Sequence, residues 1–334
     1  MRKLLKNLNK YTIALSALSA AALTNADILT SVRPLGFIAS SIADGITETQ
    51  VLIPAGASPH DYSMKPSDAK RVRDAEFVLW IGKDIDAFLE KSIAQRDATS
   101  VLTISKLAGI ESLLGETSAH DHDHDHDHDH DHDHDHDHDH DHDHDHDHDH
   151  DHDHDHHHST NELEQDWHVW FSPKISEQVA EQLAQQLTQL YPQHQAKIAT
   201  NLETFKQQLT TTNQQITQQL AEFKDQGFYV FHDAYRYFEN AYGLQQTGYF
   251  TINPLIAPGA KKLAKIKEEI NEHKVKCLFA EPQFTPKVLQ TLQQSTNVKI
   301  GQLDPMGEKI ALGKGSYSAF LQQIADNFAQ CLQE

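Results

Sequence analysis

The chain lacks the motifs on which many enzymes and nucleic-acid-binding proteins depend. Its 334 residues contain no His-Glu-x-x-His helix, no Gly-x-Ser-x-Gly turn and no glycine-rich phosphate loop. The zinc peptidases, serine hydrolases and nucleotide-binding proteins that carry these motifs are therefore not indicated. A basic stripe is also missing, since 28 basic residues are set against 49 acidic ones. Nucleic acid and an anionic membrane surface are not expected as partners.

Long apolar runs are missing as well, apart from one short stretch near the N-terminus. Tyr11–Leu23 follows four basic residues and is too short to serve well as a membrane anchor. We interpret residues 1–26 as a cleavable export signal with cleavage after Ala26, and a buried N-terminal helix is the alternative. No cysteine follows directly, so lipid attachment has no acceptor. We therefore expect a periplasmic protein without membrane insertion.

Cysteine is scarce, with only Cys277 and Cys331 present. In an oxidising compartment an even number of cysteines favours a disulfide. A bridge between them would close a loop of about 54 residues, which the chain-entropy model values at roughly 4 kcal/mol as an upper figure. A pair of thiolate metal ligands is the alternative, although the two flanking segments, a strand and a C-terminal helix, indicate a structural role.

Residues 119–158 are dominated by alternating histidine and aspartate. They hold 21 of the 26 histidines and 18 aspartates, without which the formal net charge of −21 would be −3. Because the segment has no apolar side chains, we expect a disordered loop. Imidazole and carboxylate bind divalent cations, so the composition predicts an auxiliary metal-binding loop. A solvated charge run without a role is the alternative. The histidines at its two ends are His120, His122, His124, His154, His156, His157 and His158.

Short apolar runs alternate with helical patterns on both sides of this segment. The alternation predicts an α/β fold of two (β/α)₄-type lobes with mostly parallel sheets. The expected N-terminal lobe covers residues 27–118 and is completed by 159–192, and the C-terminal lobe covers 226–334. The expected strands are 27–31, 49–53, 76–81 and 101–104 in the first lobe, and 228–231, 244–250, 277–280 and 298–303 in the second.

Two helices are indicated between the lobes. Ser172 followed by Pro173 is typical of a helix start, and this helix is expected to run to Leu190. Residues 193–225 contain no glycine or proline, and their large apolar residues recur at intervals of three, four and seven. We predict one long rigid helix here, about 45 Å in length, that bridges the two lobes. A rigid bridge favours modest closure around a ligand.

Three histidines outside the repeat are placed where a ligand would bind. His60 lies in a loop after the second strand, His168 precedes the Ser172 helix, and His232 ends the fifth strand. Asp304 follows the last strand, and the carboxyl ends of parallel strands are the usual binding edge. Three imidazoles with a carboxylate or water suit tetrahedral zinc, whereas Mn²⁺ or Mg²⁺ would require more oxygen.

Several other polar residues are interpreted as structural or solvent-exposed. Asp304 precedes a proline and could simply begin a turn. His194 and His273 lie in polar helical segments and are expected to face solvent. Glu281 also falls at a strand end, where a structural role is expected, and the tryptophans beside His168 are expected to pack around a pocket.

These segments resemble the zinc-specific periplasmic binding proteins of bacterial ABC importers, the ZnuA family. The resemblance covers the whole chain after the export signal, including an acidic His-rich loop in the same place. The segments that carry it are DILTSVRPL at 27–35, ASPHDY at 57–62, DWHVW at 166–170, FHDAY at 231–235, EPQF at 281–284 and LDPMG at 303–307.

The resemblance implies a site and a set of partners. It assigns His60, His168 and His232 as zinc ligands in the cleft, and zinc is then delivered to a membrane permease driven by a separate ATPase. Manganese-binding relatives have a carboxylate where His232 stands, which favours zinc. Some zinc-binding members have glutamate where this chain has Pro59, so the fourth ligand is either Asp304 or water. A disulfide in the second lobe is also implied, in agreement with the two cysteines.

Three functions follow from these observations. The leading one is a monomeric zinc receptor that captures Zn²⁺ and delivers it for import. The second is a zinc hydrolase, because three histidines and a water also describe a catalytic site. The third is a periplasmic zinc buffer or adhesin that acts through the His-rich loop alone and does not require the histidines of the cleft.

Overall fold

The computed structural model describes residues 28–115, 165–251, 254, 258–272, 274–283 and 287–333. The expected export signal, the His/Asp segment with all its histidines, and His273 lie outside these residues. Within the described ranges, no helix combines the length and the apolar character that crossing a bilayer requires.

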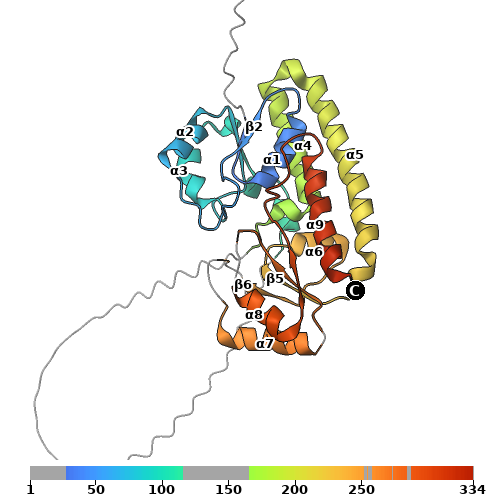
Figure 1. Ribbon diagram of the computed structural model, residues 1–334. Helices are drawn as coiled ribbons and strands as arrows, with labels where there is room; N and C mark the ends of the chain where they lie inside the picture. Colours follow the sequence, from blue (N-terminus) through green and yellow to red (C-terminus); the bar gives the residue numbers. More distant parts are fainter. Residues whose placement is uncertain are drawn as a thin grey trace, which may run out of the picture.

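Two four-stranded parallel sheets form two lobes, as expected (Figure 1). The strand orders are β2-β1-β3-β4 and β6-β5-β7-β8, so both sheets have the same topology. The first sheet contains β1 Ile28–Thr30, β2 Thr49–Val51, β3 Phe77–Trp80 and β4 Val101–Thr103, and the second contains β5 Phe228–His232, β6 Gly248–Thr251, β7 Cys277–Ala280 and β8 Lys299–Gln302. Strands β1, β3, β5 and β7 are buried at every residue, as parallel strands covered on both faces are.

Helices connect the strands and cover the sheets. They are α1 Arg33–Ile42, α2 Pro66–Asp74, α3 Glu90–Ile93, α4 Pro173–Leu190, α5 Gln195–Leu220, α6 Arg236–Tyr242, α7 Ala260–Asn271, α8 Lys287–Thr296 and α9 Ser316–Leu332. Helix α4 begins as predicted, with the Ser172 hydroxyl accepting a hydrogen bond from the Ile175 N–H at 3.2 Å.

One expected strand is shorter than its apolar pattern suggested. Residues 244–250 were expected to form a strand, but β6 begins only at Gly248. Helix α6 ends at Gly243, which adopts the left-handed conformation with φ 76°. The backbone of Gln246 then donates to the Glu239 carboxylate at 3.0 Å. The residues after α6 therefore complete the end of that helix before the strand starts.

Helix α5 joins the lobes as one continuous helix of 26 residues. At 1.5 Å per residue it is about 39 Å long, and it runs along one side of the molecule in Figure 1. Its buried residues Ile198, Phe205, Leu209, Ile216 and Leu220 follow intervals of seven and four, and the helix packs against α1, α4 and α9. Short 3₁₀ turns flank it on both sides, so it is slightly shorter than the pattern predicted.

Helix α9 ties the two lobes into one hydrophobic core. Although it is the last helix, it packs on α1 of the first lobe and on β8 of the second. The Phe37 ring of α1 lies 5.5 Å from the Phe320 ring of α9, and Phe328 of α9 lies 5.2 Å from Phe228 of β5. Because a single buried cluster contains residues of both lobes, a large hinge motion would disrupt close packing, so modest closure is favoured.

The two cysteines form a disulfide that fastens α9 to the second sheet. Cys277 is the first residue of β7 and Cys331 lies near the end of α9, with a Cα–Cα distance of 6.0 Å.

We expect the double variant Cys277→Ala/Cys331→Ala to lose up to about 4 kcal/mol of unfolding free energy, because a loop of this length is no longer closed in the unfolded chain. Urea denaturation with and without reductant measures this loss. The double variant is the control, since reductant should not affect it, and an unchanged wild-type midpoint in reductant would contradict the prediction.

Candidate metal site

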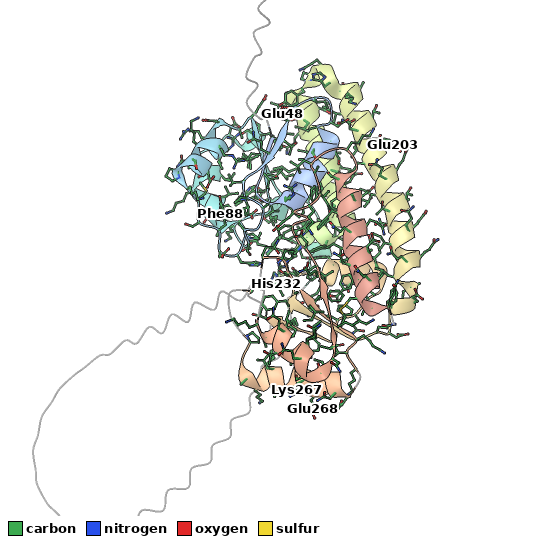
Figure 2. All side chains as sticks on the ribbon, viewed as in Figure 1. Glu48, Phe88, Glu203, His232, Lys267 and Glu268 are labelled. Atoms are coloured by element: carbon green, nitrogen blue, oxygen red, sulfur yellow. A yellow bond between two sulfur atoms is a disulfide. The ribbon has the colours of Figure 1, made fainter. Side chains whose placement is uncertain are left out.

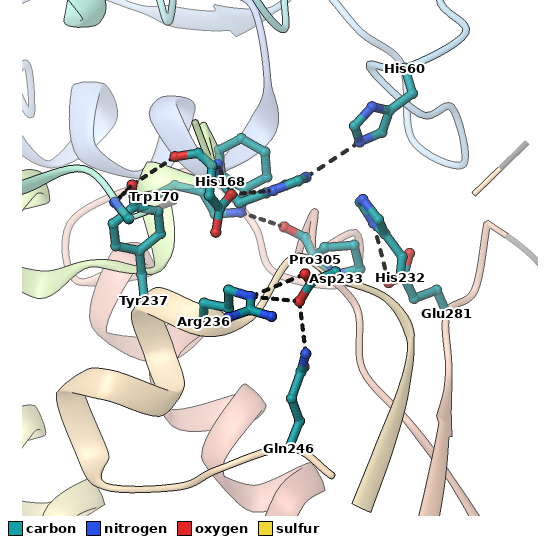
Figure 3. A network of polar contacts seen from close by, with 12 residues as sticks. His60, His168, Trp170, His232, Asp233, Arg236, Tyr237, Gln246, Glu281 and Pro305 are labelled. Carbon is teal, nitrogen blue, oxygen red and sulfur yellow. Dashed lines mark hydrogen bonds and ion pairs between the residues drawn. The ribbon is translucent and has the colours of Figure 1, made fainter. Parts of the chain in front are cut away.

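Three histidines from separate segments meet at the junction of the two lobes. His60 lies in the loop after β2, His168 immediately precedes the 3₁₀ turn before α4, and His232 is the last residue of β5. Each offers a ring nitrogen within 4.8 Å of those of the other two. Figure 2 places His232 between the lobes, and Figure 3 shows His60 facing His168 and His232.

The separation between two of the nitrogens matches that around a tetrahedral ion. The Nε2 atoms of His60 and His168 are 3.3 Å apart. Two nitrogens bound at about 2.0–2.1 Å to one tetrahedral zinc ion would be about 3.3 Å apart. The Nε2 atom of His232 is buried and has no hydrogen-bond partner among the described residues. An orphaned nitrogen of this kind is explained if a metal ion is its partner.

Asp166 holds His168 in the orientation that a metal ligand requires. The Asp166 Oδ1 atom lies 2.7 Å from His168 Nδ1 and accepts a hydrogen bond from the His168 backbone N–H at 2.9 Å. Both residues are buried. A carboxylate on Nδ1 keeps the proton there, so the Nε2 lone pair faces the site. Trp170 packs edge-on against the same imidazole, with ring centroids 5.3 Å apart.

Glu281 lies beside His232, at a longer distance than a hydrogen bond. Its Oε1 atom lies 3.6 Å from His232 Nδ1 and accepts a hydrogen bond of 3.2 Å from the Tyr235 hydroxyl. Burial and the Glu281 charge raise the pKa of Tyr235 well above its ordinary value, so this hydroxyl remains a donor. Glu281 also lines the site itself. Its place directly after β7 is the sequence signal for this contact, and the short spacing in Asp-Trp-His is the signal for Asp166.

Asp304 is not part of the histidine cluster in this structure. Its carboxylate accepts hydrogen bonds from the backbone N–H groups of Met306 at 3.0 Å and Glu308 at 2.7 Å. The Gln283 amide donates to it at 3.3 Å. The carboxylate therefore caps the turn that begins at Asp304-Pro305, and its role as fourth ligand stays a prediction. His194 is half-buried beside Tyr191 and away from this cluster.

The environment of His60 favours its neutral form. Burial, followed by the proximity of His232 and His168, lowers its pKa well below the ordinary value of 6.5. In the unfolded chain this imidazole takes up a proton as the pH falls through about 6.5, whereas the folded protein resists protonation. The unfolded state therefore binds more protons below this pH, and acidification destabilises the zinc-free protein.

We expect the zinc-free protein to lose up to about 1.4 kcal/mol of unfolding free energy per pH unit from this one group below pH 6.5. The variant His60→Asn should lack this share of the pH dependence. Urea denaturation between pH 7.5 and 5.0 measures both slopes. The variant His194→Asn is the control and should keep the wild-type slope. Equal slopes for the wild type and His60→Asn would contradict the assignment.

The fold and the site together are those of a bilobed protein in which three histidines between two α/β lobes could hold a metal ion. The chain belongs to the ZnuA family, described as "Zinc-uptake complex component A periplasmic", whose sequence model matches residues 28–331. The family resemblance seen in the sequence is thereby confirmed.

Named relatives and solved structures agree with this assignment. The chain is 59% identical over 338 residues to the high-affinity zinc uptake system protein ZnuA of Haemophilus influenzae, covering 99% of each chain. It is 42% identical over 311 residues to the ZnuA protein of Yersinia pestis, covering 93% of this chain and 92% of the relative. A crystal structure of ZnuA superimposes with a TM-score of 0.70 at 21% identity, covering 92% of this chain and 99% of the other, which supports the fold.

Proposed function

We propose that this protein captures Zn²⁺ in the periplasm and delivers it to the membrane permease of an ABC importer. His60, His168 and His232 bind the ion, and a water molecule fills the fourth position. Residues 1–26 direct export and are removed, and the protein acts as a monomer. The observation that carries this proposal is the convergence of three ring nitrogens, with a carboxylate, Asp166 or Glu281, beside each of the two buried imidazoles. The uptake function of the named relatives supports the transport step.

The donor set favours zinc over the harder divalent cations. All three ligand atoms that gather within 4.8 Å are imidazole nitrogens. Zinc accepts such a set in tetrahedral geometry, whereas Mn²⁺ and Mg²⁺ prefer sites richer in oxygen. Asp304 would add an oxygen, but its carboxylate is engaged by two backbone N–H groups of its own turn. A water molecule therefore fits the fourth position better.

The size of the site supports binding over catalysis. The pocket lined by the three histidines, Glu281 and Met306 has room for about one water molecule, about 10 Å³. A bound ion with one water therefore suits this pocket better than an ion with an ester or peptide beside it. The Glu281 carboxylate, which would be the candidate general base, is held by Tyr235 and lies against His232. We therefore infer that the ion is cargo and takes no part in hydrolysis.

Release of the ion is a local event in this proposal. His232 belongs to a strand and His168 to a buried turn, whereas His60 lies in the loop between β2 and α2. This loop is fastened to the second lobe where the Gly56 N–H donates to Glu308 Oε1 at 2.7 Å. Because the lobes share one core, movement of this loop opens the site at a lower cost than separation of the lobes.

Growth under zinc limitation tests the proposed function. A strain that lacks this protein is complemented with the wild type, His60→Ala, His232→Ala, or a variant without residues 120–158. We expect both histidine variants to fail when zinc is limiting, because the cleft is the transport site. A protein that acts through the His/Asp segment alone would give the opposite pattern. Normal growth of both histidine variants, with loss of growth only in the deletion, would refute the proposal.

A further inference from the structure

The two chain ends that flank residues 116–164 are held together at one point. The Asp166 N–H donates to the Gly115 carbonyl at 3.0 Å. The Tyr237 hydroxyl accepts a hydrogen bond of 2.9 Å from the Gly115 N–H and donates one of 2.6 Å to the Asp166 carbonyl. Tyr237 belongs to α6 of the second lobe, whereas Gly115 and Asp166 belong to the first. One hydroxyl therefore fastens both ends across the junction of the lobes.

The same Asp166 orients a proposed zinc ligand. Its carboxylate lies 2.7 Å from His168 Nδ1 and accepts the His168 backbone N–H, while its carbonyl is held by Tyr237. Figure 3 shows Tyr237, Trp170 and His168 in this network. Tyr237 is buried, and this burial raises the pKa of its hydroxyl above the ordinary value, so it remains a donor. The hydroxyl thus fixes the backbone from which the Asp166 carboxylate reaches the imidazole.

The hydrogen bonds that join Gly115, Asp166 and Tyr237 form a clasp, and its position has a physical reason. The 49 residues from 116 to 164 connect Gly115 to Gln165, and bringing together the ends of a connection this long has an entropic cost. Without the Tyr237 hydroxyl, Asp166 would move with the ends of this connection. The His168 imidazole, which Asp166 orients, would then move as well. Metal ligands tolerate little displacement, since partners of the ligating side chain strongly affect metal affinity.

We propose that Tyr237 is a positioning residue for the zinc ligand His168, because it clasps Gly115 and Asp166 and so keeps the ligand in place at the end of the 49-residue connection. The inference rests on the proposed function. Tyr237 does not touch the ion and acts only through Asp166. It also explains how a connection of this length is accommodated immediately before a ligand.

The variant Tyr237→Phe tests the clasp, with Tyr242→Phe as the matched control. Tyr242 lies on the same helix, is buried, and donates one hydrogen bond of 2.6 Å to Asn213 Oδ1, away from the site. Zinc affinity of the full chain is measured by competition with a chelator at less than one equivalent of zinc. We expect Tyr237→Phe to bind zinc about 2- to 12-fold more weakly, the net contribution of the one hydrogen bond that reaches the Asp166 carbonyl, and Tyr242→Phe to bind like the wild type.

Two further measurements separate positioning from a general loss of stability. The visible spectrum of the protein with one equivalent of Co²⁺ should change in Tyr237→Phe and remain unchanged in Tyr242→Phe, because it reports ligand geometry. In a double-mutant cycle with Asp166→Asn, which alone should cost about 10- to 100-fold, the two effects should be less than additive.

The outcomes distinguish the clasp from the site that it supports. Three results would each overturn the role of Tyr237 and leave the proposed function intact. They are additive effects in the double-mutant cycle, an unchanged cobalt spectrum in Tyr237→Phe, and an equal loss of zinc affinity in both tyrosine variants. If wild-type affinity survives the combined loss of His60, His168 and His232, the proposed function itself fails, and the clasp with it.

Discussion

Replacing His168 with alanine is expected to weaken zinc binding in the cleft by about 10²- to 10³-fold. Binding free energies of about 10–16 kcal/mol for a four-ligand zinc site correspond to roughly 2.5–4 kcal/mol per ligand, and about 1.4 kcal/mol is a factor of ten. His60→Ala and His232→Ala should have effects of the same order. His168→Ala should be the most severe, because it also leaves the buried Asp166 carboxylate without the imidazole that it contacts at 2.7 Å.

The measurement must separate the cleft from the His/Asp segment, which provides 21 histidines of its own. Competition titration is therefore performed in the full chain and in the variant that lacks residues 120–158. The variant His194→Ala is the control, since it removes an imidazole outside the cluster and should bind like the wild type. If His168→Ala binds as tightly as His194→Ala in the shortened background, the cleft histidines are not the ligands.

Replacing Phe328 with alanine is expected to lower the unfolding free energy by about 3–5 kcal/mol. Its ring is completely buried in α9. It contacts Phe279 of β7 and Phe228 of β5 with ring centroids 4.8 and 5.2 Å apart, and it stacks on Phe238 of α6 at 5.5 Å. Truncation leaves a cavity where the sheet, α6 and α9 meet, and close-packed surroundings can collapse into it only partly.

Thermal and urea denaturation of the zinc-free protein measure this loss. Gln330→Ala, two residues further along α9, is the control and should change stability by about 0.5 kcal/mol or less, because Gln330 is exposed. Saturating zinc should raise the unfolding free energy of Phe328→Ala as it does that of the wild type. A ligand that binds the folded state and not the unfolded state stabilises the fold. A loss below about 1 kcal/mol in Phe328→Ala would show that α9 is not essential to the shared core.

Local sequence patterns were sufficient for most elements of the fold, although β6 begins four residues later than its pattern indicated. The start of α4 depends on Ser172, whose hydroxyl accepts a hydrogen bond from the Ile175 N–H of the same turn, and on Pro173, whose fixed φ suits the first helical position. The continuous helix α5 follows from apolar spacing and from the absence of glycine and proline. Strands β1, β3, β5 and β7 follow from short apolar runs. Because these elements depend on residues only a few positions apart, they can be predicted from one amino-acid sequence.

The outline of the site was also present in the sequence, since strand ends in parallel sheets share one edge. That rule indicated His60, His232 and Asp304 equally. The structure brings His60 and His232 together with His168, whereas the Asp304 carboxylate turns to the N–H groups of Met306 and Glu308. Position at a strand end is a property of the backbone, but the direction of a short side chain depends on which donors lie nearest to it.

Sequence by itself thus determined which helices and strands form, the two-lobed architecture and the identity of the three histidines. Only the tertiary structure decided how those histidines are oriented. The Asp166 carbonyl is held by Tyr237, 71 residues away, and Tyr235 holds Glu281 from 46 residues away. Such contacts leave no local pattern, because the first depends on how the two lobes pack together and the second on how two segments of the second lobe pack together. The physical reason is range: backbone propensity acts over a few residues, whereas ligand geometry is fixed by hydrogen bonds between elements that only the completed core brings together.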